Sequence, residues 1–208
     1  ACWKTYLGRP ESDEFRKNSM VVLAWGLRCV GRYEEAVVIC DAYRELNQRD
    51  PEKRMNVVMT LQLTNTESHC LSKLRRYDDA LDVDRWALRV ATSAYGELDV
   101  DSLEAANNLG QSLADLGRYQ EARSLLHDSL QKSKDTHGDG SDGSITLLLR
   151  ETYAQALYND PEATEDDLLE AVAMLEKLLP EHKRIFGPLH PRTVEMQKDV
   201  DRAKIMLR

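Results

Sequence analysis

The chain has 208 residues, enough for one large domain or two small ones, with 42% hydrophobic and 31% charged residues but only 6 Pro and 10 Gly, as is typical of amphipathic helices. Its net charge is −8, and basic residues alternate with acidic ones, so no basic face is available to attract a nucleic acid. No apolar run approaches the roughly 20 residues that a membrane-spanning helix needs, which argues against membrane insertion.

A six-residue motif occurs three times along the chain: Gly31–Ala36, Arg75–Ala80 and Gly117–Ala122. Its tyrosines lie 44 and then 42 residues apart, and a period in this range indicates stacked supersecondary units. Each copy suits a turn between two helices, because Gly or Arg ends the first helix, acidic residues begin the next and Ala permits close contact. Apolar residues recur at helical spacing on both sides of the motif.

The motif predicts four helical hairpins and a final helix that covers the exposed face of the last hairpin. No linker or low-complexity segment separates them, so we expect a single domain over residues 1–208. Because Leu7-Gly8-Arg9-Pro10 is typical of the end of an earlier hairpin, the chain is expected to begin inside a repeat. The predicted hairpins and the final helix cover about residues 11–50, 51–96, 98–138, 144–187 and 191–207.

An aromatic residue followed by glycine ends the later hairpins, at Tyr95-Gly96, His137-Gly138 and Phe186-Gly187. We expect these glycines to adopt the left-handed conformation of a helix cap. The first hairpin has Asp50-Pro51 at this place instead. In the fourth hairpin the turn is longer, and Pro180 removes one helical hydrogen bond, which predicts a kink or an interruption of the second helix.

These motifs resemble those of tetratricopeptide repeat (TPR) proteins, and the 42-residue spacing with an aromatic-Gly turn is similar to the kinesin light chain subtype. The best matches are Asn107-Asn108-Leu109 leading to Gly117–Ala122, and the segment from Phe186 to Thr193. The resemblance implies an all-α fold, a right-handed α-solenoid of about four TPR-type hairpins plus a terminal capping helix. The first helices of such hairpins line a concave groove for peptides or partner domains.

In the register that this resemblance implies, seven polar residues face the groove: Asn65, His69, Asn107, Asn108, Gln111, Glu151 and Gln155. Side-chain amides can donate to and accept from the backbone of an extended peptide, although such residues are equally typical of a solvated helix face. The positions at which related repeats grip a carboxylate with Lys or Arg carry other residues: Asn18, Gln62, Glu104 and Leu148. A neutral or basic peptide is therefore a better candidate ligand than an acidic one.

The sequence shows no nucleophile with a neighbouring base, no paired catalytic carboxylates and no phosphate-binding loop, so we expect no enzyme activity and no cofactor. The four cysteines lack the spacing of a metal site or a disulfide framework. The Gly- and Asp-rich segment 137–143 likewise lacks the ligand spacing of a calcium loop. Free thiols favour the cytoplasm or another reducing intracellular compartment. An organelle stays open, since the chain starts without Met.

Two functions follow from this sequence. The first is a non-catalytic adaptor or scaffold that binds a peptide or partner domain in the concave groove. The alternative is a structural subunit that is permanently embedded in a larger multiprotein assembly. In both cases the expected partners are other proteins, and neither nucleic acid nor membrane insertion is involved.

Overall fold

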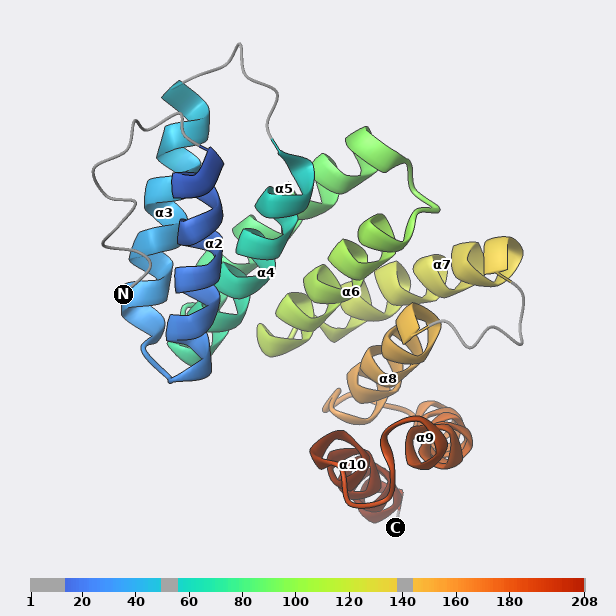
Figure 1. Ribbon diagram of the computed structural model, residues 1–208. Coiled ribbons are helices and arrows are strands. Elements are labelled where there is room, and N and C mark those ends of the chain that lie inside the picture. Colours follow the sequence, from blue (N-terminus) through green and yellow to red (C-terminus); the bar gives the residue numbers. More distant parts are fainter. Residues whose placement is uncertain (1–13, 50–55, 138–143, 208) are drawn as a thin grey trace. The chain divides into compact units, whose positions relative to one another are not determined.

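The structure is a computed structural model that describes residues 14–49, 56–137 and 144–207. Within these ranges the chain forms helices and no strand (Figure 1). The helices are α2 (Glu14–Cys29), α3 (Tyr33–Arg49), α4 (Val57–Lys73), α5 (Tyr77–Tyr95), α6 (Val100–Asp115), α7 (Tyr119–His137), α8 (Ser144–Tyr158), α9 (Glu165–Phe186) and α10 (Pro191–Met206).

Contacts between the helices divide the chain into two compact units, Ala1–Asn108 and Leu109–Arg208, and each is described by itself. In the first unit α2 packs against α3 and α4, while α4 also packs against α3 and α5 (Figure 1). In the second unit α8 packs against α7 and α9, and α10 packs against α9 and α8. These pairs confirm the predicted all-α fold of helical hairpins. The assignment of residues 1–208 to one domain stays a prediction.

Each copy of the repeated motif lies at a turn between two helices, and its tyrosine is the first residue of the second helix. At the turn before α3 the backbone N–H of Arg32 donates to the carbonyl of Leu27 at 2.9 Å, and that of Gly31 donates to Arg28 at 3.1 Å. These two hydrogen bonds close the helix end as a Schellman motif. A Schellman motif requires a positive φ at its penultimate residue, which is Gly31 here. This explains why glycine is preferred at that position.

The aromatic-Gly turns differ from the predicted left-handed cap. Gly96 has φ 88° and ψ 166°, and Gly187 has φ 91° and ψ 157°. Both lie in a region of backbone space that only glycine occupies readily, well away from the left-handed helical region near ψ 47°. The chain therefore leaves the helix in an extended direction, and the requirement for glycine is stricter than a left-handed cap would impose.

Helix α9 is not interrupted at Pro180, so this part of the prediction is wrong: the helix runs without a break from Glu165 to Phe186. Pro180 is exposed, so the hydrogen bond that it removes is lost on the solvent side, where water can satisfy the freed carbonyl. The start of α9 is fixed by a capping box in which Thr164 and Asp167 each accept from the other's backbone N–H.

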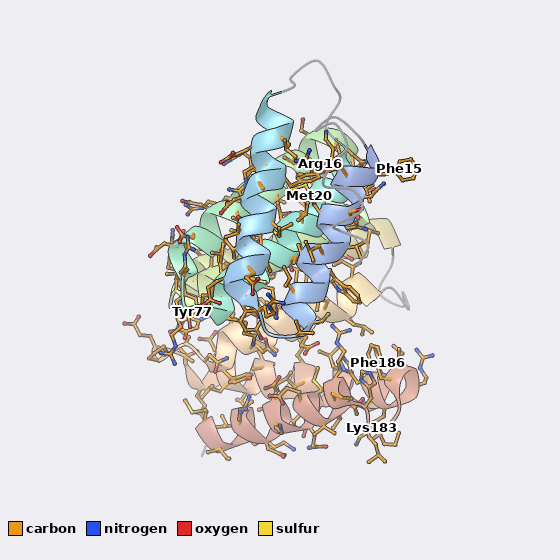
Figure 2. The ribbon with its side chains drawn as sticks, turned by 60° about the vertical axis from the view of Figure 1, so that its left-hand side comes forward. Phe15, Arg16, Met20, Tyr77, Lys183 and Phe186 are labelled. Carbon is orange, nitrogen blue, oxygen red and sulfur yellow. The ribbon has the colours of Figure 1, made fainter. Side chains whose placement is uncertain are left out.

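The core of the first unit consists of two clusters of small and aliphatic side chains. One joins α2 and α3 to α4 and contains Met20, Ala24, Cys40, Tyr43 and Leu63. Figure 2 labels Met20 of this cluster on α2. The other extends to α5 and contains Leu27, Ala36, Val37, Cys70, Leu71, Ala80 and Val83. Because both clusters use the inner faces of α2 and α4, the opposite faces of these helices are left for solvent or a partner.

In the second unit the last helix is fixed to α8 by a buried carboxylate. Asp199 of α10 is 1% exposed and accepts hydrogen bonds from Gln155 Nε2 at 2.9 Å, Tyr158 Oη at 2.9 Å and Arg202 Nη1 at 3.0 Å. Met196 and Val200 are buried on the same helix. Helix α10 therefore covers the last hairpin, as predicted for a terminal capping helix.

Several predictions concern segments outside the described residues: the start inside a repeat at Leu7–Pro10, the Asp50-Pro51 turn, the cap at Gly138 and the loop through residue 143. Within the part of the chain that the structure describes, no helix combines the length and apolar character needed to cross a membrane.

Candidate partner-binding groove

Two adjoining hollows open on the first helices of the first unit. The α2–α4 hollow is lined by Val21, Val22, Trp25 and Arg28 of α2 and by Gln62, Asn65 and Thr66 of α4. The α4–α6 hollow is lined by Val58, Leu61, Gln62, Thr64 and Asn65 of α4, Ala87 of α5, and Asp101, Glu104, Ala105 and Asn108 of α6. Since Gln62 and Asn65 line both, the two hollows form one continuous surface, which we call the first-unit groove.

The α2–α4 hollow is the apolar end of this groove. Val22 is 67% exposed and Trp25 is 55% exposed. Both point away from the face of α2 that buries Met20, Ala24 and Leu27. Large apolar side chains that lie together in a hollow with this much exposure are typical of interaction sites rather than of ordinary solvent-exposed surface.

The α4–α6 hollow is the acidic end. Its charged lining residues are Asp101 and Glu104, and no cation is among the described residues that line it. The side-chain amide of Asn65 donates to Glu104 Oε1 at 3.2 Å, which orients the carboxylate without neutralising it. Asp99 supplies the cap of α6, because its Oδ1 accepts from the backbone N–H of Asp101 at 2.9 Å. Asp101 and Glu104 are therefore not needed to begin the helix.

The structure brings two of the seven predicted residues, Asn65 and Asn108, into the groove. His69 is exposed one turn beyond Asn65, with its ring centroid 6.5 Å from that of Tyr33. Asn107 is buried at 5% exposure, and its Oδ1 has no partner among the described residues.

The remaining three predicted residues belong to the second unit. Gln111 is exposed and donates to Asp115 at 3.0 Å within its own helix. Gln155 holds Asp199, as described above. Glu151 lines a separate pocket, so the structure does not gather the seven residues into one site.

Sequence reasoning missed Val22, Trp25 and Asp101. A signal for the first two was available, because Met20, Ala24 and Leu27 follow the spacing of a buried helix face and place Val22 and Trp25 outside it. The position of Asp101 depends on how α6 begins relative to α4, and the local sequence pattern carries no such information.

The pocket that contains Glu151 lies between α8, the end of α9 and the start of α10. It is lined by Leu147, Leu148, Glu151, His182, Arg184, Ile185, Phe186 and Arg192. Glu151 Oε2 lies 3.8 Å from His182 Nε2. Burial raises the pKa of the Glu151 carboxyl and lowers the pKa of the His182 imidazole, so burial favours the neutral form of each. The guanidinium of Arg192 stacks over the Phe186 ring at 5.3 Å.

Two of the three described cysteines have the character of core thiols, whereas Cys29 is exposed. Cys40 and Cys70 are buried, and burial raises the pKa of Cys70 to about 11 and that of Cys40 still further. Both are therefore protonated and unreactive near neutral pH. No group of His, Cys, Asp and Glu within the described ranges could hold a metal ion.

Two family models, both described as tetratricopeptide repeat, match residues 7–72 and 59–135. A search of curated proteins by sequence gave no match. Among solved structures, the nearly identical TPR-like repeats of a kinesin light chain-type protein from Podosopora anserina are similar with a TM-score of 0.65 and 17% identity, over 92% of this chain and 86% of that one. A variant of those repeats gives a TM-score of 0.67.

BtubC (BKLC) from P. vanneervenii is similar with a TM-score of 0.65 and 16% identity, over 99% of this chain and 82% of that one. Repeats of this kind generally mediate interactions between proteins, and their fold is typically non-catalytic. Residues 7–72 and 59–135 thus match tetratricopeptide repeat models, and the fold of the chain is similar to that of kinesin light chain-type repeats.

Proposed function

We propose that this protein is a non-catalytic adaptor or scaffold that holds an extended segment of a partner protein in the first-unit groove. The observation that carries the proposal is the exposure of Val22 and Trp25 in a hollow that also presents the amides of Gln62 and Asn65. Apolar contact supplies affinity, while amides satisfy the backbone of an extended chain. The two hollows, of about 300 and 370 Å³, suit single side chains rather than a folded domain.

The energetics favour Trp25 as the main anchor. Covering its exposed part and that of Val22 removes apolar surface from water, which is worth about 1 kcal/mol or more for each side chain. This is insufficient alone, because association costs at least about 4 kcal/mol in lost freedom of motion. Backbone bonds to the groove amides must add to it, so the ligand must run along several helices.

The proposal is tested with decapeptides selected on the protein from a random displayed library. The affinity of the best peptide is then measured by fluorescence anisotropy against Val22→Ser, Trp25→Ser and Val38→Ser. Val38 is the matched control, because it is 63% exposed on α3 and lines neither hollow. We expect Kd to rise about fivefold for Val22→Ser and about thirtyfold for Trp25→Ser, with no change for Val38→Ser. A peptide that binds all three variants alike would refute groove binding.

The alternative, a subunit fixed in a larger assembly, draws support from a different surface. Ile205 and Met206, at the end of α10, are 66% and 57% exposed, and a permanent neighbour would cover them. Native mass spectrometry of the protein isolated from its source separates the two functions. A constant stoichiometric complex supports the subunit role, whereas a free monomer at its own mass excludes it.

A further inference from the structure

We infer that the first-unit groove selects a partner segment in which an apolar residue is followed or preceded, two or three residues away, by Lys or Arg. The apolar side chain enters the α2–α4 hollow and the cation enters the α4–α6 hollow. This inference rests on the proposed function and names the class of segment that the groove accepts.

The distribution of charge assigns the cation to the α4–α6 hollow. Asp101 and Glu104 line this hollow, and the neutral amide of Asn65 leaves the charge of Glu104 in place. The opposite end of the groove contains Arg28, which repels a second cation and leaves Trp25 to receive an apolar side chain. Each residue type therefore fits one hollow only, and an acidic residue at the cation position is rejected by like charge.

Structural requirements explain Asp101 only in part and do not explain Glu104. The cap of α6 is already provided by Asp99. Asp101 lies near the positive end of the helix dipole, which favours a carboxylate there, but Glu104 lies one turn further along, where the effect has declined. Glu104 takes part in no ion pair that the described residues form across the α4–α6 hollow, since no cation lines it. A ligand cation would supply the missing charge.

The distance between the hollows sets the spacing in the ligand. The two hollows lie on either side of α4, and packed helices are about 8–10 Å apart. An extended chain advances about 3.3 Å per residue and a polyproline II segment about 3.1 Å, so the two side chains are separated by about three residues. The i, i+3 arrangement of polyproline II is the best fit, because it returns side chains to the same face after three residues.

The test uses the selected peptide that binds through Val22, together with versions in which its basic residue is replaced by Gln or Glu. Each is measured by anisotropy against the native protein, against Asp101→Asn/Glu104→Gln, and against Glu34→Gln/Asp78→Asn. The last variant removes the same charge from exposed helix starts that line neither hollow. Circular dichroism verifies that all variants are folded.

We expect the native protein to bind the basic peptide at least about tenfold more tightly than the Glu version, with a preference that declines as salt is added. The preference should vanish in the groove variant and persist in the control variant. Glu104→Lys, which swaps the charge in the hollow, should reverse the preference, so that the peptide with Glu in place of its basic residue binds more tightly. Selected peptides that bind through Val22 but are acidic, or that ignore Asp101 and Glu104, would overturn this inference and leave the proposed function standing. Failure of any peptide to depend on Val22 and Trp25 would refute both.

Discussion

The α4–α6 hollow and the pocket between α8 and α10 occupy equivalent places in two repeats, and they carry different charges. Aligning the turns Leu98–Leu103 and Leu189–Val194 pairs Asp101 with Arg192. Both helices begin alike: Asp99 caps α6 by accepting from the N–H of Asp101 at 2.9 Å, and His190 caps α10 by accepting from that of Arg192 at 3.2 Å. The fold therefore fixes how the helix starts, while the side chain beside the cap differs in charge between the two junctions.

The same alignment shows a second difference: a polar residue is buried in α10 and its counterpart in α6 is partly exposed. Asp199 of α10 pairs with Asn108 of α6. Asp199 is buried and holds α8 through Gln155 and Tyr158, whereas Asn108 is partly exposed and lines the groove. The polar residue is therefore buried in hydrogen bonds at one junction and partly exposed at the other.

The largest expected effect comes from removing the buried carboxylate of Asp199. Asp199→Ala leaves the Tyr158 hydroxyl and the Gln155 amide without their acceptor, which should lower the free energy of unfolding by about 3–5 kcal/mol in urea denaturation. Asn108→Ala, at the equivalent position, should cost less than about 1 kcal/mol. Equal losses in the free energy of unfolding at the two positions would show that the buried and the partly exposed residue do not differ in their contribution to stability.

An intermediate effect should be common to both junctions. Gly96→Ala and Gly187→Ala each force a side chain into a backbone region that only glycine adopts readily, at a cost of about 1–3 kcal/mol. No atom outside the glycine's immediate neighbours lies within 4 Å of an added Cβ at either position, so the cost is purely conformational and should be similar. Thermal unfolding of the two variants checks this. A harmless Gly187→Ala would mean that the two turns differ.

The smallest effect concerns pH and should occur at one junction only. His182, which is 2% exposed, pairs in the alignment with Ala91, so the first unit has no histidine here. Because burial lowers the pKa of His182 below its ordinary 6.5, the unfolded chain binds the proton more readily. The contribution of His182 to stability is therefore present above about pH 6.5 and is lost as pH falls toward the folded-state pKa.

The paired carboxyl of Glu151 acts in the opposite sense, because burial raises its pKa and the folded state gains stability as it is protonated. His182→Ala should consequently change the slope of unfolding free energy against pH between about 7 and 5, making the variant relatively more stable toward acid. A slope identical to that of the native protein would exclude His182 as the titrating group.

How much the sequence alone could predict depends on the range of the interactions concerned. Helix starts at Tyr33, Tyr77 and Tyr119 followed from a local motif, and the structure confirms them. The exposure of individual side chains was harder to predict, because it depends on how neighbouring helices pack. Glu67, for example, is a charged residue that is nevertheless buried, because Arg44 of α3 reaches across to form an ion pair with it.

The groove shows the same limit. The family register named Asn65 and Asn108, which line the α4–α6 hollow, but it also included Asn107, which the packing of α6 buries. It contained no information on Trp25 or Asp101, whose roles depend on which faces α2 and α6 turn toward α4. Side-chain chemistry at a junction between repeats is a tertiary property, and only the structure supplies it.

The most direct test of partner binding in the first-unit groove is photocrosslinking from the groove itself. A benzophenone amino acid is placed at position 25, or at position 38 as the control, and the protein is irradiated with the selected peptide before mass spectrometry locates the adduct. Binding in the first-unit groove predicts efficient crosslinking from Trp25→benzoylphenylalanine and none above background from the substituted Val38. Equal yields from both positions, or an adduct from position 38 alone, would contradict it.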